Sequence, residues 1–491
     1  MIDNKTYLGI IDNIQNDYID YPVPSFGYSP SKKYPEYKLE TVSDVPNPIY
    51  DLIRQGLHYL QFDNDNYGKN TWNPLSHIIK PGDTVVVKPN MVRHHNPNPE
   101  SGINCVVTHP SLVRAVLDYV LIALKNNGKV IIADAPLQDC DFELMKERSG
   151  YNHLFEFYKS YGIEIPCVDL RNHKSIIKHG LNIHHDVGSI INDTRIVDLG
   201  KLSEFHNIDK DRYNNLRVTN YDPSIIVKHH SKEKNEYAIA ATILEADVII
   251  NMPKPKTHRY AGLTLSLKNM VGINTNKDYL PHHTLHSQQE GGDAYKKANY
   301  LKRQLESIID LRNLAVGKHM YATGTVLNYL EHGIAILDRL VSKDEHLFGS
   351  WHGNDTIWRT ILDLNRIIRY SDKTGTIRDI PQRRVFNVAD MIISGEKEGP
   401  LSPTQKKVGI IAMSEDAVGL DEILATIMGV DYQYIPSISN ASKPNSHPIG
   451  IGNSIICSNN TKWNGKISSE LLQEDCFSFE LTSGWKDYNQ K

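Results

Sequence analysis

Short apolar runs and a helical pattern alternate along residues 84–133. The run at 84–87 is rich in β-branched residues and follows a Pro-Gly-Asp turn, which is typical of a strand covered on both faces. Residues 111–127 place apolar side chains at helical spacing, with Pro110 before them and Gly128 at their end. A second apolar run follows at 130–133. A strand, a helix and a strand in this order predict a βαβ unit of a parallel sheet.

Further segments predict more strands, at residues 163–170, 248–250 and 408–413. Residues 294–369 repeat apolar side chains at mostly helical spacing. We therefore expect an α/β fold, with an open, mostly parallel sheet, helices on both faces, a helical insertion and an irregular N-terminal region. The predicted segments are an irregular N-terminal lead-in packed on the core (1–80), the first part of the α/β core (81–290), a mostly helical insertion (291–380), the completion of the core (381–435) and an irregular C-terminal tail (436–491). The lead-in is predicted to contain one helix, at residues 48–62.

Charged and amide side chains follow four of the predicted strands. Ligands of open α/β sheets bind beyond the carboxyl ends of the strands, so we expect these side chains to share one site. The alternative for each motif alone is a solvated lysine in a proline-flanked turn. The strand ends carry Lys88 and Asn90, then Asp134, then Lys254, Lys256 and His258, and finally Asp390 and Glu396 beyond a strand near Val388.

A cluster of lysines is the chemistry expected at this site. Clustered ammonium groups are tolerated only beside acidic residues or an anionic ligand, so the pattern predicts a phosphorylated or carboxylated substrate. A neighbouring lysine lowers the pKa of a histidine and favours its neutral form. We therefore expect His258 to act as the acid/base catalyst; the alternative is a histidine that caps a turn. The expected catalytic residues are His258, Asp134, Asp390 and Glu396, and the expected substrate-binding residues are Lys88, Asn90, Lys254, Lys256, Lys268, Asn269, His286 and Arg359.

Residues 264–272 predict a short helix that Thr264 caps and Gly272 ends. Free N–H groups at its start would add affinity for an anion. The alternative is an ordinary short amphipathic helix.

His282 and His286 have the spacing of two metal ligands on one helix face. A site of histidine and carboxylate ligands would take zinc, manganese or iron. Pro281 makes a loop as good an interpretation as a helix, and a mobile loop would instead lend His286 to the substrate site. A second candidate set for a divalent ion is Asp134, Asp139 and Asp141. A divalent metal is the one cofactor that these patterns suggest.

Composition excludes several classes of protein. The chain has 491 residues, 40% of them hydrophobic, and 54 basic against 58 acidic side chains give a net charge of −4, so no basic footprint for nucleic acid is present. Its five cysteines form no CxxC pair, which argues against a disulfide framework, a zinc knuckle and an iron–sulfur cluster. We find no secretory signal and no apolar run long enough to span a membrane, and expect a soluble cytoplasmic protein. Glycine-rich nucleotide motifs, GxSxG and HExxH do not occur.

Four sequence blocks between residues 84 and 430 carry a family resemblance. They are Lys88-Pro89-Asn90 with Thr108-His109-Pro110; Asp134-Ala135-Pro136; the stretch 246–272 with Lys254, Lys256, His258 and Leu267-Lys268-Asn269; and the stretch 390–429 with Asp416 and Asp421. In these blocks the chain resembles the family named domain of unknown function 362, which implies the α/β fold and a strand-end site. The chain differs at Glu396, where the family often has Glu-Gly-Asn-Gly-Pro, and it has no ferredoxin-like cysteine segment. Residues 351–365 resemble a branch with a helical insertion, which is associated with surface-polysaccharide gene neighbourhoods.

The leading hypothesis is an enzyme that acts on an anionic small molecule, such as a phosphorylated or uronic-acid sugar, in surface-polysaccharide biosynthesis. The alternative is a non-catalytic protein that binds a metabolite or a metal. The sequence does not predict the reaction or the oligomeric state.

Overall fold

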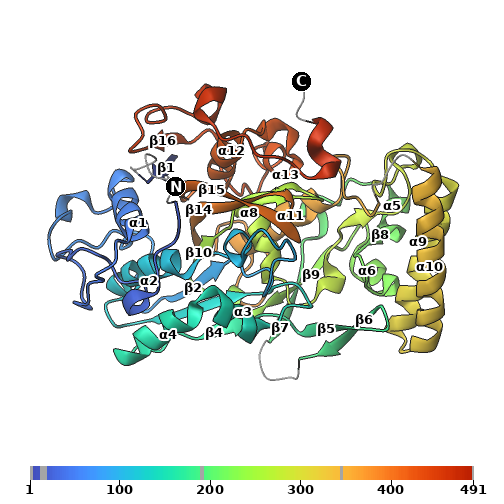
Figure 1. Cartoon of the computed structure of the whole chain (residues 1–491), viewed down its shortest axis with the longest axis horizontal. Helices are drawn as coiled ribbons and strands as arrows, with labels where there is room; N and C mark the ends of the chain where they lie inside the picture. Colours follow the sequence, from blue (N-terminus) through green and yellow to red (C-terminus); the bar gives the residue numbers. More distant parts are fainter. Residues whose placement is uncertain (1–3, 12–18, 188–192, 343–346, 489–491) are drawn as a thin grey trace.

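One large sheet runs through the computed structural model, which describes residues 4–11, 19–187, 193–342 and 347–488 (Figure 1). Strand β15 is antiparallel to both of its neighbours, β12 is antiparallel to β11, and the other adjacent pairs are parallel. The prediction of an α/β fold with a mostly parallel sheet is confirmed. In spatial order the strands are β16 (Ile455–Cys457), β1 (Lys5–Ile10), β15 (Ser402–Ser414), β14 (Arg384–Glu398), β10 (Val248–Met252), β2 (Thr84–Pro89), β3 (Lys129–Asp134) and β4 (Cys167–Asp169). The short strand β11 (Lys256–His258) also pairs with β14, and β12 (Gly262–Thr264) pairs with β11.

Helices cover both faces of this sheet, so its central strands are buried on both sides. Val85 and Val87 belong to one core with Val248 and Ile250, whereas Val86 points to the opposite core. This alternation explains the uninterrupted apolar run in β2. The first face packs against α1 (Pro48–Tyr59), α2 (Pro110–Leu124), α3 (Phe142–Ser149) and α4 (Tyr151–Ser160), and the second against α7 (Ala241–Leu244), α11 (Ile357–Tyr370) and α12 (Ala417–Ile427).

Both ends of the chain contribute strands that the sequence did not predict. Strand β1 comes from the N-terminal lead-in and lies between β15 and β16, which comes from the C-terminal tail. The tail also contains α13 (Pro436–Ser439). The two regions predicted to be irregular therefore complete one side of the sheet.

Strand β14 is longer than its predicted course, which ended at Asp390. It continues to Glu398 because it stays paired with β15, and a bulge lies between Met391 and Ile393. The expectation that Asp390 lies at a strand end is therefore wrong: it lies in the middle of β14. The bulge interrupts the alternation of side chains that would have revealed the full strand.

Smaller elements surround the sheet. They are the hairpin β5 (His173–Lys178) and β6 (Leu181–Asp186), the pair β7 (Thr194–Asp198) and β9 (Glu236–Ala240), the pair β8 (Leu216–Arg217) and β13 (His283–Thr284), and the helices α5 (Lys210–Asn214), α6 (Pro223–His229) and α8 (Ser266–Asn269).

The helical insertion contains a pair of long helices, α9 (Tyr300–Gly317) and α10 (Tyr321–Val341). Figure 1 shows them side by side at the end of the molecule opposite α1. Helix α11 also falls in the predicted insertion but packs on the sheet. Among the helices of the described ranges, none is both long and apolar enough to cross a membrane.

Candidate functional site

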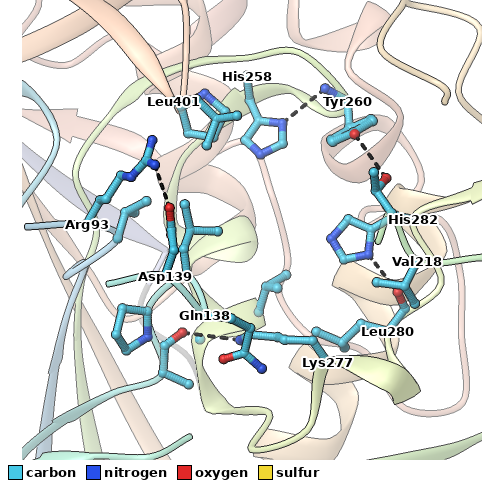
Figure 2. Close-up of a pocket in the computed structure, with 18 of the residues that line it drawn as sticks. Arg93, Gln138, Asp139, Val218, His258, Tyr260, Lys277, Leu280, His282 and Leu401 are labelled. Carbon is cyan, nitrogen blue, oxygen red and sulfur yellow. Dashed lines mark hydrogen bonds and ion pairs between the residues drawn. The ribbon is translucent and has the colours of Figure 1, made fainter. Parts of the chain in front are cut away.

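A cavity of about 340 Å³ lies where β2, β3 and β10 end, beside β11 and α8 (Figure 2). Figure 2 shows side chains from several segments arranged around an open centre. This is the rim at which the sequence placed a shared site. The residues predicted for that site that line the cavity are Asn90, Asp134, Lys256, His258, Lys268 and Asn269, and the metal candidate His282 lines it too.

A row of buried asparagines fixes the position of Lys256. The Nζ atom of Lys256 donates to Oδ1 of Asn90 at 2.6 Å, and Nδ2 of Asn90 donates to Oδ1 of Asn269 at 2.7 Å. The row continues as Asn269 donates to Asn251 at 2.7 Å and Asn251 to Asn387 at 2.9 Å. Because each amide both donates and accepts, the row joins β2, α8, β10 and β14 beneath the cavity and holds the ammonium group in one place.

Lys88 and Asp134 form a buried ion pair in the wall of the cavity. Nζ of Lys88 lies 2.8 Å from Oδ1 of Asp134, and Oδ2 of Asp134 accepts the backbone N–H of Met91 at 2.7 Å. Lys88 does not itself line the cavity. Burial lowers the pKa of its ammonium group, and the charge of Asp134 opposes that shift. The pair ties β2 to β3 at the edge of the site.

Basic side chains outnumber acidic ones around the cavity. Its lining contains Arg93, Arg259, Lys256, Lys268 and Lys277, against the carboxylates of Asp134 and Asp139. Both carboxylates are paired, with Lys88 and Arg93 respectively. The cavity therefore has an excess of positive charge, which favours an anionic ligand.

Three lysines of the lining have no carboxylate partner within the described part of the chain. Lys256 donates to an amide and to backbone carbonyls, and Lys277 donates to the carbonyls of Ala135 and Asn274 at 3.2 and 3.4 Å. Burial lowers the pKa of Lys256 and of Lys277 to about 7, and that of Lys268 to about 8. The charge of Lys254 adds to the effect at Lys256. Bound negative charge would reverse these shifts, because it favours the ammonium form.

His258 presents a hydrogen-bond donor to the cavity. Its Nδ1 accepts the backbone N–H groups of Tyr260 at 3.1 Å and Ala261 at 3.2 Å. Burial, followed by the charge of Lys268, holds the pKa of the imidazole well below its usual 6.5. In the neutral ring Nδ1 then has the lone pair and Nε2 carries the proton. Figure 2 shows this second nitrogen turned toward the open centre.

His282 has the opposite arrangement. Its Nδ1 lies 2.6 Å from the carbonyl oxygen of Leu280, so Nδ1 carries the proton and Nε2 has the lone pair. Burial lowers the pKa of the ring to about 4. Figure 2 shows Nε2 facing the same open centre. The ring of Tyr260 lies between the two histidines, 6.0 Å from each.

Two of the predicted residues form a separate buried cluster outside the cavity lining. Nζ of Lys254 lies 3.0 Å from Oδ2 of Asp390 and also contacts the hydroxyl of Tyr21. Tyr21 donates to Oδ1 of Asp390 at 2.6 Å, and the backbone N–H of His109 donates to Oδ2 at 2.8 Å. Neither Lys254 nor Asp390 lines the cavity. Their pairing holds the N-terminal region against β14.

Glu396, His286 and Arg359 also lie outside the cavity. Glu396 accepts from Lys406 at 3.0 Å and from the backbone of Glu480 at 3.1 Å. His286 contacts Glu306 at 3.2 Å. Arg359 donates to a backbone carbonyl at 2.7 Å and forms an ion pair at 3.0 Å with Asp355, which precedes α11.

The sequence left a helix and a loop open for the segment from His282 to His286, and the structure excludes the helix. The segment is extended through β13, which pairs with β8, and the two imidazoles have separate partners. Among the described residues, no group of three or more His, Cys, Asp or Glu side chains could hold a metal ion.

Helix α8 is held by a carboxylate rather than by Thr264. Asp421 accepts the backbone N–H of Ser266 at 2.7 Å and of Leu267 at 2.9 Å, and burial raises its pKa to about 7. The prediction that Thr264 caps this helix is wrong, because Thr264 belongs to β12 and Leu265 precedes the helix. The Thr264 hydroxyl instead lines the cavity, with no hydrogen-bond partner among the described residues.

The sequence did not predict several of the residues that line the cavity. Lys277 lies in a 3-10 turn, and Arg93 lies four residues past the end of β2. Tyr260 and Arg259 follow His258 directly. The run of polar residues around His258 was the one signal that could have indicated the last two.

Three comparisons place the chain beside known proteins, and the family model agrees with the sequence resemblance. The chain is 26% identical over 198 residues to a thylakoid-associated protein of Synechocystis sp., a match that spans 40% of this chain and 41% of that protein. A crystal structure of a Thermotoga maritima protein aligns with 74% of this chain and 55% of its own, at 12% identity and a TM-score of 0.29. The model of the family described as "Domain of unknown function (DUF362)" matches residues 85–199 and 201–426. The chain therefore belongs to the DUF362 family.

Proposed function

We propose that the protein is an enzyme that binds a phosphorylated or carboxylated small molecule in this cavity. The observation that carries the proposal is the group of Lys256, Lys268 and Lys277, which face one cavity without a carboxylate partner in the described ranges. Buried ammonium groups without a counter-charge are costly, and proteins retain them where a ligand supplies the charge. The polar atoms of Asn90, Asn269 and Thr264 beside them would orient the ligand.

The two histidines suggest proton transfer as the reaction class. His282 offers a lone pair and remains neutral at pH 7, so its Nε2 would accept a proton from the substrate. The electron pair of the broken C–H bond would move onto a substrate oxygen. The Nε2–H group of His258 would donate a hydrogen bond to that oxygen, and the lysines would stabilise the negative charge on the oxygen. This differs from the role expected for His258, because its Nδ1 lone pair is already occupied by backbone N–H groups.

The binding step is tested with Lys268→Met. We expect this variant to lose affinity for the anion at least tenfold and to unfold at a higher temperature, because a partly buried charge without a partner is removed. Inorganic phosphate, sugar phosphates and uronates are the probes in a thermal-shift and calorimetric screen. Lys232→Met, at an exposed position, is the matched control and should change neither property. Unchanged affinity of every hit for Lys268→Met would refute the proposed binding site.

The catalytic step is tested on the anions that bind. Each is incubated with the protein in deuterium oxide, and loss of substrate C–H signals is followed by NMR. His282→Gln should abolish exchange while ligand affinity stays within about threefold, and His258→Gln should slow it. Binding without any exchange or conversion would instead identify a non-catalytic metabolite-binding protein.

Among anionic metabolites, a phosphorylated or uronic-acid sugar of surface-polysaccharide biosynthesis is the first class to screen. The five cysteines are free thiols, which supports a reducing compartment such as the cytoplasm as the place of action.

A further inference from the structure

Helix α10 buries its polar face against the rest of the molecule. Asn328 and Glu331 accept hydrogen bonds from Arg312 of α9, and Asp338 accepts from Asn299 at 3.1 Å. Asn328 and Asp338 are buried. These residues recur at spacings of three and seven, so they form one stripe along the helix.

The opposite face of α10 is apolar and exposed. Tyr329 and Leu340 are 74% and 78% exposed. Successive positions along this face are separated by four and three residues in turn, which is the pattern of the seam between two packed helices. The seam positions are 326, 330, 333, 337 and 340. A soluble helix normally has the reverse arrangement. The exposed apolar side chains are Val326, Tyr329, Leu330, Ile336, Leu337, Leu340 and Val341.

We propose that this face is the interface between two copies of the chain. The exposed parts of its seven apolar side chains amount to roughly 800 Å² per copy, which is the share that each partner contributes to a stable interface. A contiguous apolar surface of this size exceeds what a monomer ordinarily leaves exposed. The spacing of the apolar seam fits a second helix packed against it, and a two-fold axis places α10 of a second copy there.

The sequence of α10 also gives the register of the pair. Gly333 lies at the middle of the seam, and a Cβ atom added there would meet nothing within 4 Å, so two backbones can approach closely at this point. An antiparallel crossing on Gly333 places Val326 of one copy opposite Leu340 of the other. The same operation places Tyr329 opposite Leu337 and Leu330 opposite Ile336. Every position of the seam then meets an apolar partner.

A membrane surface fits this helix less well. Amphipathic helices that bind membranes usually carry lysine and arginine on their polar face. The polar positions of α10 instead include Glu331 and Asp338, with Arg339 as the single lysine or arginine of the helix.

The test is the mass of the full chain in solution, measured by sedimentation velocity from about 1 to 100 μM. The natural chain should form a dimer, and Leu340→Glu should weaken it at least tenfold. Gln304→Glu adds the same charge at an exposed position of α9 and should leave the dimer unchanged. Adding Val326→Lys to Leu340→Glu should restore the dimer, since each new carboxylate would face a new ammonium group of the other copy.

Three outcomes would overturn the proposal. They are a natural chain that is monomeric throughout this range, a dimer that Leu340→Glu does not weaken, and a monomer that co-sediments with vesicles of phosphatidylcholine and phosphatidylglycerol. The last would assign the face to a membrane. Because the substituted positions are already exposed, each variant should keep the far-UV circular dichroism spectrum of the natural chain, and this spectrum verifies its folding independently of the dimer.

Discussion

Replacement of Asp134 by asparagine tests whether the Lys88–Asp134 pair holds the edge of the site together. The carboxylate accepts the Lys88 ammonium group at 2.8 Å and the Met91 N–H at 2.7 Å. An asparagine of the same shape has one oxygen and one NH₂ group, so it can accept only one of these two donors. The other donor then remains buried without a partner, and Lys88 loses its counter-charge.

The magnitude of the loss follows from two limits. A buried donor without a partner costs about 1–3 kcal/mol, and breaking a buried ion pair from one side costs about 3–5 kcal/mol. Lys88 can escape by releasing its proton, which at pH 7 costs about 4.8 kcal/mol from its ordinary pKa of 10.5. We therefore expect Asp134→Asn to lower the free energy of unfolding by about 3–5 kcal/mol at pH 7.

The pH dependence identifies the cause of the loss. A lysine whose pKa is depressed in the folded state binds fewer protons there than in the unfolded chain, so its contribution to stability rises with pH up to the unfolded pKa. The deficit of the variant should therefore shrink between pH 7 and pH 9, by about 1.4 kcal/mol per unit where Lys88 is neutral in the variant and charged in the natural protein.

Urea denaturation at pH 7, 8 and 9 measures both quantities. Asp139→Asn is the control, because it removes a carboxylate from the same cavity that is 30% exposed and pairs with Arg93. A pair of this kind contributes about 0–1 kcal/mol. A loss below about 1 kcal/mol for Asp134→Asn, or a larger loss that does not change with pH, would contradict this account of Lys88.

Three further predictions concern the surroundings of the cavity. Gly272→Ala should lower the free energy of unfolding by about 1–3 kcal/mol in urea, since its Cβ atom would lie 2.1 Å from an oxygen of the same ion pair. Sulfate, whose charge is the same from pH 6 to pH 9, should bind at least tenfold more weakly at pH 9 than at pH 6 in calorimetry. The reason is that the lysines lose their protons over this range, since the pKa is about 7 for Lys256 and Lys277 and about 8 for Lys268. Asp421→Ala should cost about 1 kcal/mol of stability and also weaken sulfate binding, since the carboxylate holds the start of the helix that carries Lys268.

The central strands could be predicted because their signals are local. The run at β2 is apolar at every position since both of its faces are covered, and a periodic helix follows it. Strand β1 gave no comparable signal. Its position in the sheet depends on pairing with β15, about four hundred residues away, and no local pattern near β1 indicates that partner.

The candidate site was predictable to the extent that parallel strands fix where their ends meet. Asn90, Asp134 and Lys256 reached one cavity for this reason. The roles of the histidines were not predictable, because the tautomers of His258 and His282 depend on which backbone groups the loops bring to Nδ1. No spacing rule describes those contacts.

The buried lysines divide into two groups that the sequence could not separate. Lys88 and Lys254 each have a carboxylate within 3.0 Å, so their charges are balanced inside the protein. Removal of either lysine should therefore lower the free energy of unfolding. Lys256 and Lys268 face the cavity without such a partner in the described residues, so their removal should be felt in ligand binding. Lys254 and Lys256 are two residues apart in one proline-flanked motif, yet only Lys254 forms an ion pair with Asp390. The position of one aspartate in the middle of β14 therefore decides which lysine is structural and which is available to a ligand.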